Sequence, residues 1–206
     1  MGDFRRAGTF FAMLVQLSRP FMRFPFRLRA TGLEHIPAKG GFVLASNHLS
    51  NLDPWPVGVP LFPRQVHYMA KSELYRNPVL RLILERAGAF PVRRGERDPG
   101  SFKTAVAHAR AGGVVAMFPE GTRRAKGLRK RRVAARHAGA ARIALAAGVP
   151  LVPAAVKGTD RLRRLGPVRV AYGPPIELRT NGARRVAAQD ATERLMAAIS
   201  ELEETL

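Results

Sequence analysis

Short apolar runs, each too brief to form a typical helix, constrain the fold of this chain most strongly. Residues 42–46 (FVLAS) and 113–118 (GVVAMF) are almost continuously apolar instead of alternating, which is the pattern of strands that are buried on both faces. We predict strands at residues 26–30, 42–46, 66–70, 88–92, 113–118, 151–156 and 168–171. Helical patterns are predicted between and after them, at residues 78–85, 101–111, 134–147 and 183–206.

This alternation predicts one α/β domain with a largely parallel, covered sheet and flanking helices. A length of 206 residues is enough for one such core and short for two. The chain contains no cysteine, which excludes disulfides, thiolate metal sites and cysteine nucleophiles. Its five histidines show no metal-ligand spacing, so no metal is expected.

The first 25 residues form a separate amphipathic segment, which we predict to be a membrane-association helix preceding a domain at residues 26–206. Apolar side chains recur at helical spacing among flanking arginines, and they include Phe4, Ala7, Phe11, Leu14, Val15 and Met22. A cationic helix with an apolar face can lie in a bilayer interface. The alternative is a helix that packs on the protein's own core. A signal peptide is not expected, because basic residues follow the apolar run and no cleavage site is evident.

The charge balance of the chain points to anionic partners. Lys and Arg number 35 against 15 Asp and Glu, a formal net charge of +20. Such a chain is attracted to nucleic acid, to an anionic membrane surface or to phosphorylated substrates.

A polar stretch, SNHLSNLD (residues 46–53), follows the apolar run at 42–46. His48 and Asp53 are five residues apart, a spacing of about 140° on a continuous helix, so a direct hydrogen bond requires a turn between them. Pro54 predicts an extended Asp53 that caps the following helix, with residues 47–52 folding His48 back towards it. A histidine oriented by a carboxylate can act as a general base. Alone, the spacing also fits a structural turn, because short motifs match often by chance.

A second polar stretch, FPEGTRR (residues 118–124), follows the apolar run at 113–118. Gly121 permits close approach of a ligand, Thr122 offers a hydroxyl, and Arg123 can bind phosphate in bidentate fashion. Active sites in α/β sheets lie beyond the carboxyl ends of the strands, so we expect the two stretches to share a cleft. The chain has neither a cysteine nor a G-x-S-x-G nucleophile motif, so the remaining chemistry is acyl transfer to a bound alcohol without a covalent enzyme intermediate. The alternative interpretation of residues 118–124 is an ordinary polar turn without a role in ligand binding.

From residue 32 to residue 173 the chain resembles the glycerolipid acyltransferase family, which contains the bacterial 1-acylglycerol-3-phosphate acyltransferases. Four blocks of the family can be followed in order. NHLSNLD at 47–53 and FPEGTR at 118–123 match their blocks, whereas GAFPVRR at 88–94 and VPLVPAAV at 149–156 resemble theirs. Arg93 departs from the family, in which this position is often acidic. The loop that follows Arg123 is unusually basic, with Arg124, Lys126, Arg129, Lys130, Arg131 and Arg132.

The resemblance implies that His48 is the general base and that Asp53 orients it. It also implies an acceptor-phosphate region that comprises Arg94, Glu120, Gly121, Thr122 and Arg123, with Lys71 as a further phosphate candidate. No cofactor is implied, because the acyl thioester (acyl-CoA or acyl-ACP) is a co-substrate.

The implied reaction moves a fatty acyl group to the sn-2 hydroxyl of 1-acylglycerol-3-phosphate and gives phosphatidic acid. The same chemistry on a lyso-ornithine lipid or on glycerol 3-phosphate is one alternative. A non-catalytic basic protein that coats anionic membranes or nucleic acid is another. The expected partners are a lysophospholipid acceptor, an acyl thioester donor and an anionic membrane surface, without nucleic acid. The expected location is the cytoplasmic face of the cell membrane, as a peripheral or monotopic protein.

Overall fold

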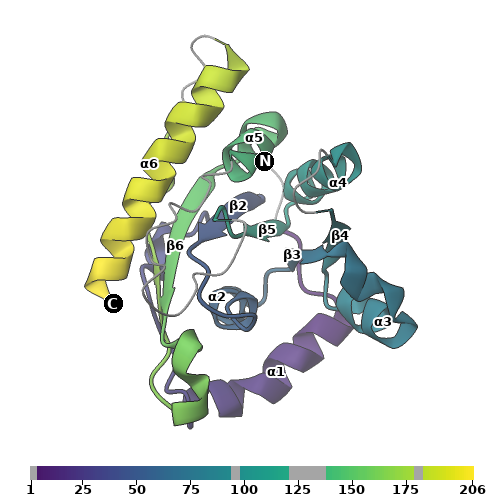
Figure 1. The fold of residues 1–206 in the computed structure, drawn as a ribbon, viewed down its shortest axis with the longest axis vertical. Helices are drawn as coiled ribbons and strands as arrows, with labels where there is room; N and C mark the ends of the chain where they lie inside the picture. The colour runs from purple at the N-terminus through teal and green to yellow at the C-terminus, as the bar shows by residue number, and fades with distance from the viewer. Residues whose placement is uncertain (1–3, 94–97, 121–137, 179–182) are drawn as a thin grey trace.

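The computed structural model describes residues 4–93, 98–120, 138–178 and 183–206. They form a three-layer α/β/α domain around one seven-stranded sheet, with strand order β1-β7-β6-β2-β5-β3-β4 (Figure 1). The strands are β1 (Arg29–Thr31), β2 (Phe42–Ser46), β3 (Val66–Lys71), β4 (Phe90–Val92), β5 (Val114–Met117), β6 (Leu151–Lys157) and β7 (Arg169–Tyr172). The α-helices are α1 (Thr9–Arg23), α2 (Pro54–Gly58), α3 (Pro78–Arg86), α4 (Pro99–Arg110), α5 (Gly139–Ala147) and α6 (Arg184–Thr205).

The predicted fold class is confirmed. Every neighbouring pair of strands is parallel except β6 and β7. As a result β1 and β7, at one edge, run opposite to the five remaining strands.

The central strand β2 shows why the apolar runs are continuous. All five of its residues are buried. Phe42 and Leu44 contribute to the core under α1 and α2, whereas Val43 and Ala45 contribute to the core under α4, α5 and α6. Because a strand's side chains alternate between faces, a strand covered on both sides must be apolar at consecutive positions.

Two predicted strands are shorter than expected at their N-terminal ends. The strand predicted at 26–30 begins only at Arg29, because Arg27 has a φ of 44°, outside the extended region. The strand predicted at 88–92 begins at Phe90. The helix predicted at 134–147 is observed from Gly139, and its first predicted residues, 134–137, lie outside the described residues.

Helix α1 packs partly on the protein's own core, which was the alternative to membrane contact, and it also exposes other apolar side chains. Phe11 and Val15 are buried in the core of the protein itself, so part of the apolar face predicted to contact lipid packs internally. The exposed large apolar side chains of this segment lie four residues apart or follow the helix: Met13, Leu17, Phe21 and Phe24. Within the described residues, no helix combines the length and the apolar character that crossing a bilayer requires.

Candidate active site

His48 and Asp53 form a buried pair beyond the carboxyl end of β2. Nδ1 of His48 lies 2.8 Å from Oδ2 of Asp53, and the two residues are 5% and 0% exposed. The same Oδ2 accepts hydrogen bonds from the backbone N–H groups of Leu49 and Ser50, at 2.6 and 2.7 Å. Oδ1 accepts a hydrogen bond from the hydroxyl of Thr159 at 2.5 Å. Four donors therefore converge on one buried carboxylate, which offsets much of the cost of removing its charge from water.

The predicted return of His48 towards Asp53 is confirmed, but the conformation predicted for Asp53 is wrong. Asp53 is helical, with φ −51° and ψ −39°, and its side chain makes no cap hydrogen bond to α2. The preference for an extended residue before proline is a local steric effect of modest size. Here it is outweighed by four hydrogen bonds that hold the carboxylate towards residues 48–50 and 159.

Three residues that the sequence analysis did not assign to the site hold this turn in place. The side-chain amide of Asn47 donates to the carbonyl of Val156 at 2.9 Å and accepts from the Val156 N–H at 2.8 Å. These bonds join the end of β2 to the end of β6. Gly158 then turns the chain at a φ of 93°, where a Cβ would lie 2.3 Å from the carbonyl oxygen of Pro167, and Thr159 follows it to reach Asp53. The available signal was polar residues directly after two apolar strands.

The two polar stretches meet, as predicted from their positions at the carboxyl ends of apolar strands. β2 pairs with β5, and the ring of Phe118 stacks on the ring of His48 with centroids 4.4 Å apart and planes 24° apart. Glu120, the next predicted site residue, is 3% exposed. Gly121, Thr122 and Arg123 lie outside the described residues.

Lys71, a further predicted phosphate ligand, lies towards the β4 edge of the sheet. Lys71 ends β3 and is exposed, and its Nζ lies 2.8 Å from Oε1 of Glu73. The hydrogen bond from Lys71 lowers the pKa of the Glu73 carboxyl. Arg93 donates its backbone N–H to Asp98 at 3.0 Å. Arg94 lies outside the described residues.

The hydrogen bond between His48 and Asp53 has the geometry that a histidine general base requires. A carboxylate that accepts a hydrogen bond from Nδ1 of an imidazole holds the hydrogen there and leaves Nε2 as the basic nitrogen. The phenyl ring of Phe118 covers one face of the imidazole. The hydrogen bond to Asp53 and this stacking therefore both restrict the orientation of the His48 ring. In the part of the chain that the structure describes, no cluster of three or more His, Asp or Glu side chains is placed to hold a metal ion.

Comparison with known proteins identifies the family of the chain. The model of the acyltransferase family matches residues 27–157, which contain His48, Asp53 and Glu120. The 1-acyl-sn-glycerol-3-phosphate acyltransferase of Bacillus subtilis (strain 168) is 36% identical over 180 residues, covering 84% of this chain and 86% of the relative. The enzyme of the same name from Borreliella burgdorferi is 29% identical over 136 residues, covering 65% of this chain and 52% of the relative.

A solved structure shows the same fold. The 1-acyl-sn-glycerophosphate (LPA) acyltransferase PlsC from Thermotoga maritima superposes with a TM-score of 0.67, at 23% identity, over 94% of this chain and 79% of that chain. The match of the family model over more than half of the chain, together with the Bacillus relative, shows that this protein is an O-acyltransferase and belongs to the acyltransferase family.

Proposed function

We propose that the protein transfers a fatty acyl group from an acyl thioester, on coenzyme A or acyl carrier protein, to the sn-2 hydroxyl of 1-acylglycerol-3-phosphate, giving phosphatidic acid. The names of the relatives support the acceptor. The observation that carries the mechanism is the 2.8 Å contact between Nδ1 of His48 and Oδ2 of Asp53 in a fully buried setting. Membership of an enzyme family removes the alternative of a non-catalytic basic protein.

In the proposed reaction, Nε2 of His48 takes the proton of the acceptor hydroxyl as its oxygen attacks the thioester carbonyl carbon. The imidazolium that forms is stabilised by the Asp53 carboxylate. The tetrahedral intermediate then collapses, the carbon–sulfur bond breaks, and the imidazolium returns the proton to the departing thiolate. No cofactor is required, because the thioester itself supplies the activated acyl group.

Four backbone N–H groups of the turn at residues 47–53 are engaged within the turn, so the oxyanion of this intermediate needs other donors. The N–H groups of Leu49 and Ser50 donate to Asp53, that of Leu52 donates to the Ser50 hydroxyl, and that of Asp53 donates to the Ser50 carbonyl. These four groups of the turn at 47–53 are already engaged. Their hydrogen bonds instead stabilise the carboxylate that orients His48.

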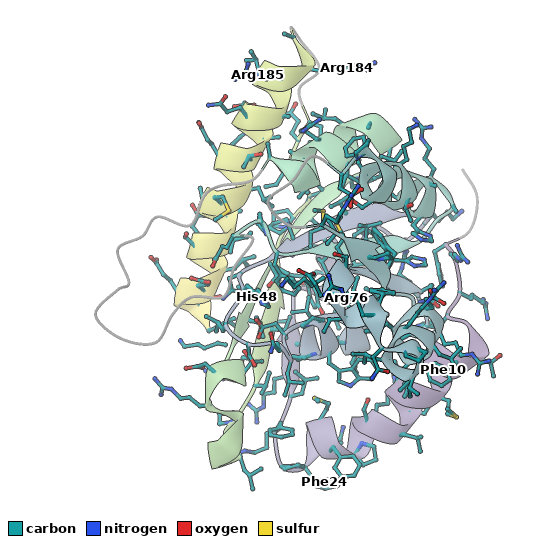
Figure 2. All side chains as sticks on the ribbon, turned by 45° about the vertical axis from the view of Figure 1, so that its right-hand side comes forward. Phe10, Phe24, His48, Arg76, Arg184 and Arg185 are labelled. Atoms are coloured by element: carbon teal, nitrogen blue, oxygen red, sulfur yellow. The ribbon has the colours of Figure 1, made fainter. Side chains whose placement is uncertain are left out.

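We further propose that α1 holds the enzyme on an anionic membrane surface, at the cytoplasmic face where acyl thioesters are available. Leu17 and Phe21 are 63% and 66% exposed, and Arg19 and Arg23 are exposed beside them. Phe24 lies at the outer surface at the end of the helix (Figure 2) and is 75% exposed. Apolar side chains framed by arginines suit the boundary between anionic head groups and acyl chains.

The test of the chemistry uses purified protein with acyl-CoA and lysophosphatidic acid, following thiol release and phosphatidic acid by mass spectrometry. We expect His48→Ala to lower turnover by about 10³-fold or more, because general base catalysis and positioning are lost together. His35→Asn is the matched control. His35 follows β1, an edge strand that β7 and β6 separate from β2, the strand that precedes His48. Unchanged turnover in His48→Ala would refute the mechanism. Faster transfer to lyso-ornithine lipid or glycerol 3-phosphate would refute the acceptor.

The membrane proposal has a separate test. Leu17→Glu/Phe21→Glu should abolish flotation of the protein with phosphatidylglycerol vesicles. Gln16→Glu, which adds a charge at an exposed position of the same helix, should leave flotation nearly unchanged. Equal flotation of all three proteins would show that α1 is not the anchor.

A further inference from the structure

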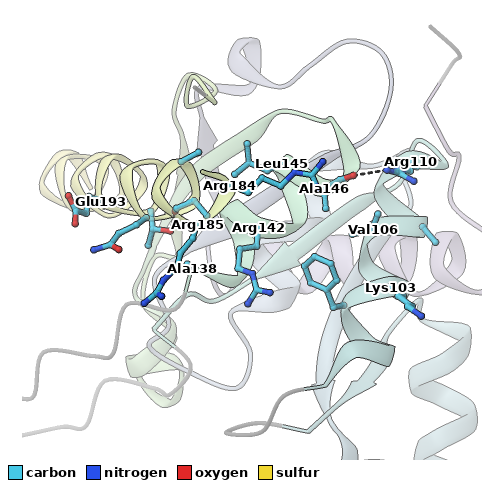
Figure 3. A pocket seen from close by; sticks show the side chains of 16 residues that line it. Lys103, Val106, Arg110, Ala138, Arg142, Leu145, Ala146, Arg184, Arg185 and Glu193 are labelled. Carbon is cyan, nitrogen blue, oxygen red and sulfur yellow. Dashed lines mark hydrogen bonds between the residues drawn. The ribbon is translucent and has the colours of Figure 1, made fainter. Parts of the chain in front are cut away.

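A large groove lies on the surface of the helical layer that covers the second face of the sheet. It has a volume of about 1690 Å³ and is lined by α4, α5 and the first half of α6 (Figure 3). Helix α5 packs between α4 and α6, and its sequence, GAARIALAA, is dominated by alanine. The apolar part of the groove lining includes Phe102, Val106, Leu145 and Ala188.

The groove carries five cationic side chains and one carboxylate. The cations are Lys103, Arg110, Arg142, Arg184 and Arg185, and the carboxylate is Glu193. Arg110 donates to the carbonyl of Ala146 at 2.6 Å, and Arg142 lies over the ring of Phe102 at 5.5 Å. Within the described residues, none of the five cations has a carboxylate within 4 Å. Uncompensated positive charge of this density favours an anionic ligand.

Contacts at one end of the groove lead towards the carboxyl end of β2, where His48 lies. Ala138 lines the groove, and a Cβ on the adjacent Gly139 would lie 3.4 Å from the terminal methyl of Met117. The next residue, Phe118, stacks on His48. A short series of contacts therefore connects the groove to the proposed general base.

The groove also lies far from the proposed membrane contact. Helix α1 runs along one end of the molecule, whereas α4 and α5 lie at the opposite end (Figure 1). With α1 on a bilayer, the groove faces the aqueous phase. Its ligand therefore comes from solution and not from the membrane on which the enzyme rests.

We propose that this groove docks an acidic helix of an acyl carrier protein, which delivers the acyl thioester to His48. The inference rests on the proposed function and specifies the donor. The volume exceeds the roughly 300–1,000 Å³ of pockets that hold small ligands. A lining that combines apolar and basic side chains fits an amphipathic helix with acidic flanks.

The distribution of the cations favours a helix over a nucleotide. A single phosphate is held by donors that converge on one point, whereas these cations belong to three different helices. Figure 3 shows Lys103 and Arg185 on opposite sides of Arg142. Charges spread along a groove instead match several carboxylates spaced along a helix.

The test compares Arg142→Glu/Arg185→Glu with a matched control, Arg29→Glu/Arg86→Glu. All four arginines are exposed, both variants change the net charge equally, and the control positions lie outside the groove. Binding of hexadecanoyl-acyl carrier protein is measured by fluorescence anisotropy, and kcat/KM is measured with hexadecanoyl-acyl carrier protein and with hexadecanoyl-CoA.

We expect the groove variant to weaken carrier-protein binding by about tenfold or more and to lower kcat/KM for that donor similarly. Its kcat/KM with the coenzyme A donor should stay within about twofold of the wild type, as should every value for the control. An equal loss with both donors would assign the groove to coenzyme A and overturn the proposal. Absence of carrier-protein binding by the wild type would also overturn it.

The binding measurement is repeated in the His48→Ala background. Carrier-protein binding there that depends on Arg142 and Arg185 supports the docking surface. If the wild type then shows no acyl transfer with either donor, that result refutes the proposed function alone. The opposite result is also informative. If acyl transfer from acyl-CoA is observed and Arg142→Glu/Arg185→Glu binds the carrier protein as well as the control does, the docking surface alone is refuted.

Discussion

Two buried histidines in this protein are similarly packed but have different hydrogen-bond partners, a carboxylate for His48 and a backbone carbonyl for His67. His48 and His67 are 5% and 4% exposed, and each ring stacks on another ring. His48 stacks on Phe118 and places its Nδ1 against a carboxylate. His67 stacks on His108 with centroids 3.7 Å apart and places its Nδ1 3.0 Å from the carbonyl of Gly88.

The absence of a carboxylate gives His67 a different chemistry. Burial, followed by the neighbouring His108, lowers the pKa of His67 to about 4, against a smaller opposing effect of the hydrogen bond to Gly88. Nε2 of His67 is buried and has no hydrogen-bond partner among the described residues. The ring fills space beside Gly113, where a Cβ would lie 2.9 Å from Cδ2. His67 is therefore a neutral packing residue at physiological pH, and burial alone does not make a histidine a general base.

The largest effect that separates the two histidines is expected at the carboxylate. Asp53→Asn should lower kcat by about 10³-fold, because the imidazole loses the group that fixes its tautomer and stabilises its charged form. The measurement is turnover with lysophosphatidic acid and acyl-CoA. His67→Phe, which keeps a ring in the second site, serves as the control and should retain most of the activity. Comparable losses in both variants would erase the functional distinction between the sites.

The second effect is a pH dependence of stability that belongs to His67. Its pKa is about 4 in the folded protein and 6.5 in the unfolded chain, so the unfolded state binds the additional proton between these values. The free energy of unfolding should therefore fall as the pH drops from about 6.5 to about 4, by about 3 kcal/mol at most. Burial also lowers the pKa of His108, which adds a loss of the same sign.

Urea denaturation across this pH range measures the effect. His67→Phe should show a shallower loss of stability than the wild type, since one of the two titrating rings is absent. An identical pH dependence in the variant would show that other groups cause it.

The third effect concerns the group that holds Asp53 from the other side. Thr159→Val should lower kcat by about tenfold with little change in KM, because one buried carboxylate oxygen loses the donor that fixes it. Thr159→Ser keeps the hydroxyl and should restore most of the activity. A rise in KM without a fall in kcat, or equal losses in both variants, would contradict a role in orienting the base.

The smallest effect is expected at the exposed counterpart of the buried pair, Lys71 and Glu73. The side chains are 53% and 45% exposed, so water screens their attraction. Lys71→Ala should shift the thermal midpoint by no more than about one degree. A fall of the thermal midpoint by several degrees would show that this pair contributes more than its exposure indicates.

The sheet was predictable where local pattern and burial agree. β2 was predicted at its observed bounds and β5 and β6 within two residues of theirs, because strands covered on both faces require apolar residues at every position. β1 was misplaced because the positive φ of Arg27 follows from the turn that leads into the edge of the sheet and leaves no trace in hydrophobicity. The antiparallel pairing of β6 with β7 likewise depends on a connection whose direction no residue pattern encodes.

The chemistry of the site divides along the same line. The order of residues 46–53 and 118–123 determined by itself that a histidine, an aspartate and a second polar turn would each follow an apolar strand. That these two strands, β2 and β5, are neighbours was decided by the tertiary structure. Only the tertiary structure decided that Thr159, more than a hundred residues from Asp53, shares its carboxylate, and that cations from α4, α5 and α6 line one groove. The physical reason is that propensity and periodicity act over a few residues, whereas hydrogen bonds and charge act between whatever groups the packed chain brings together.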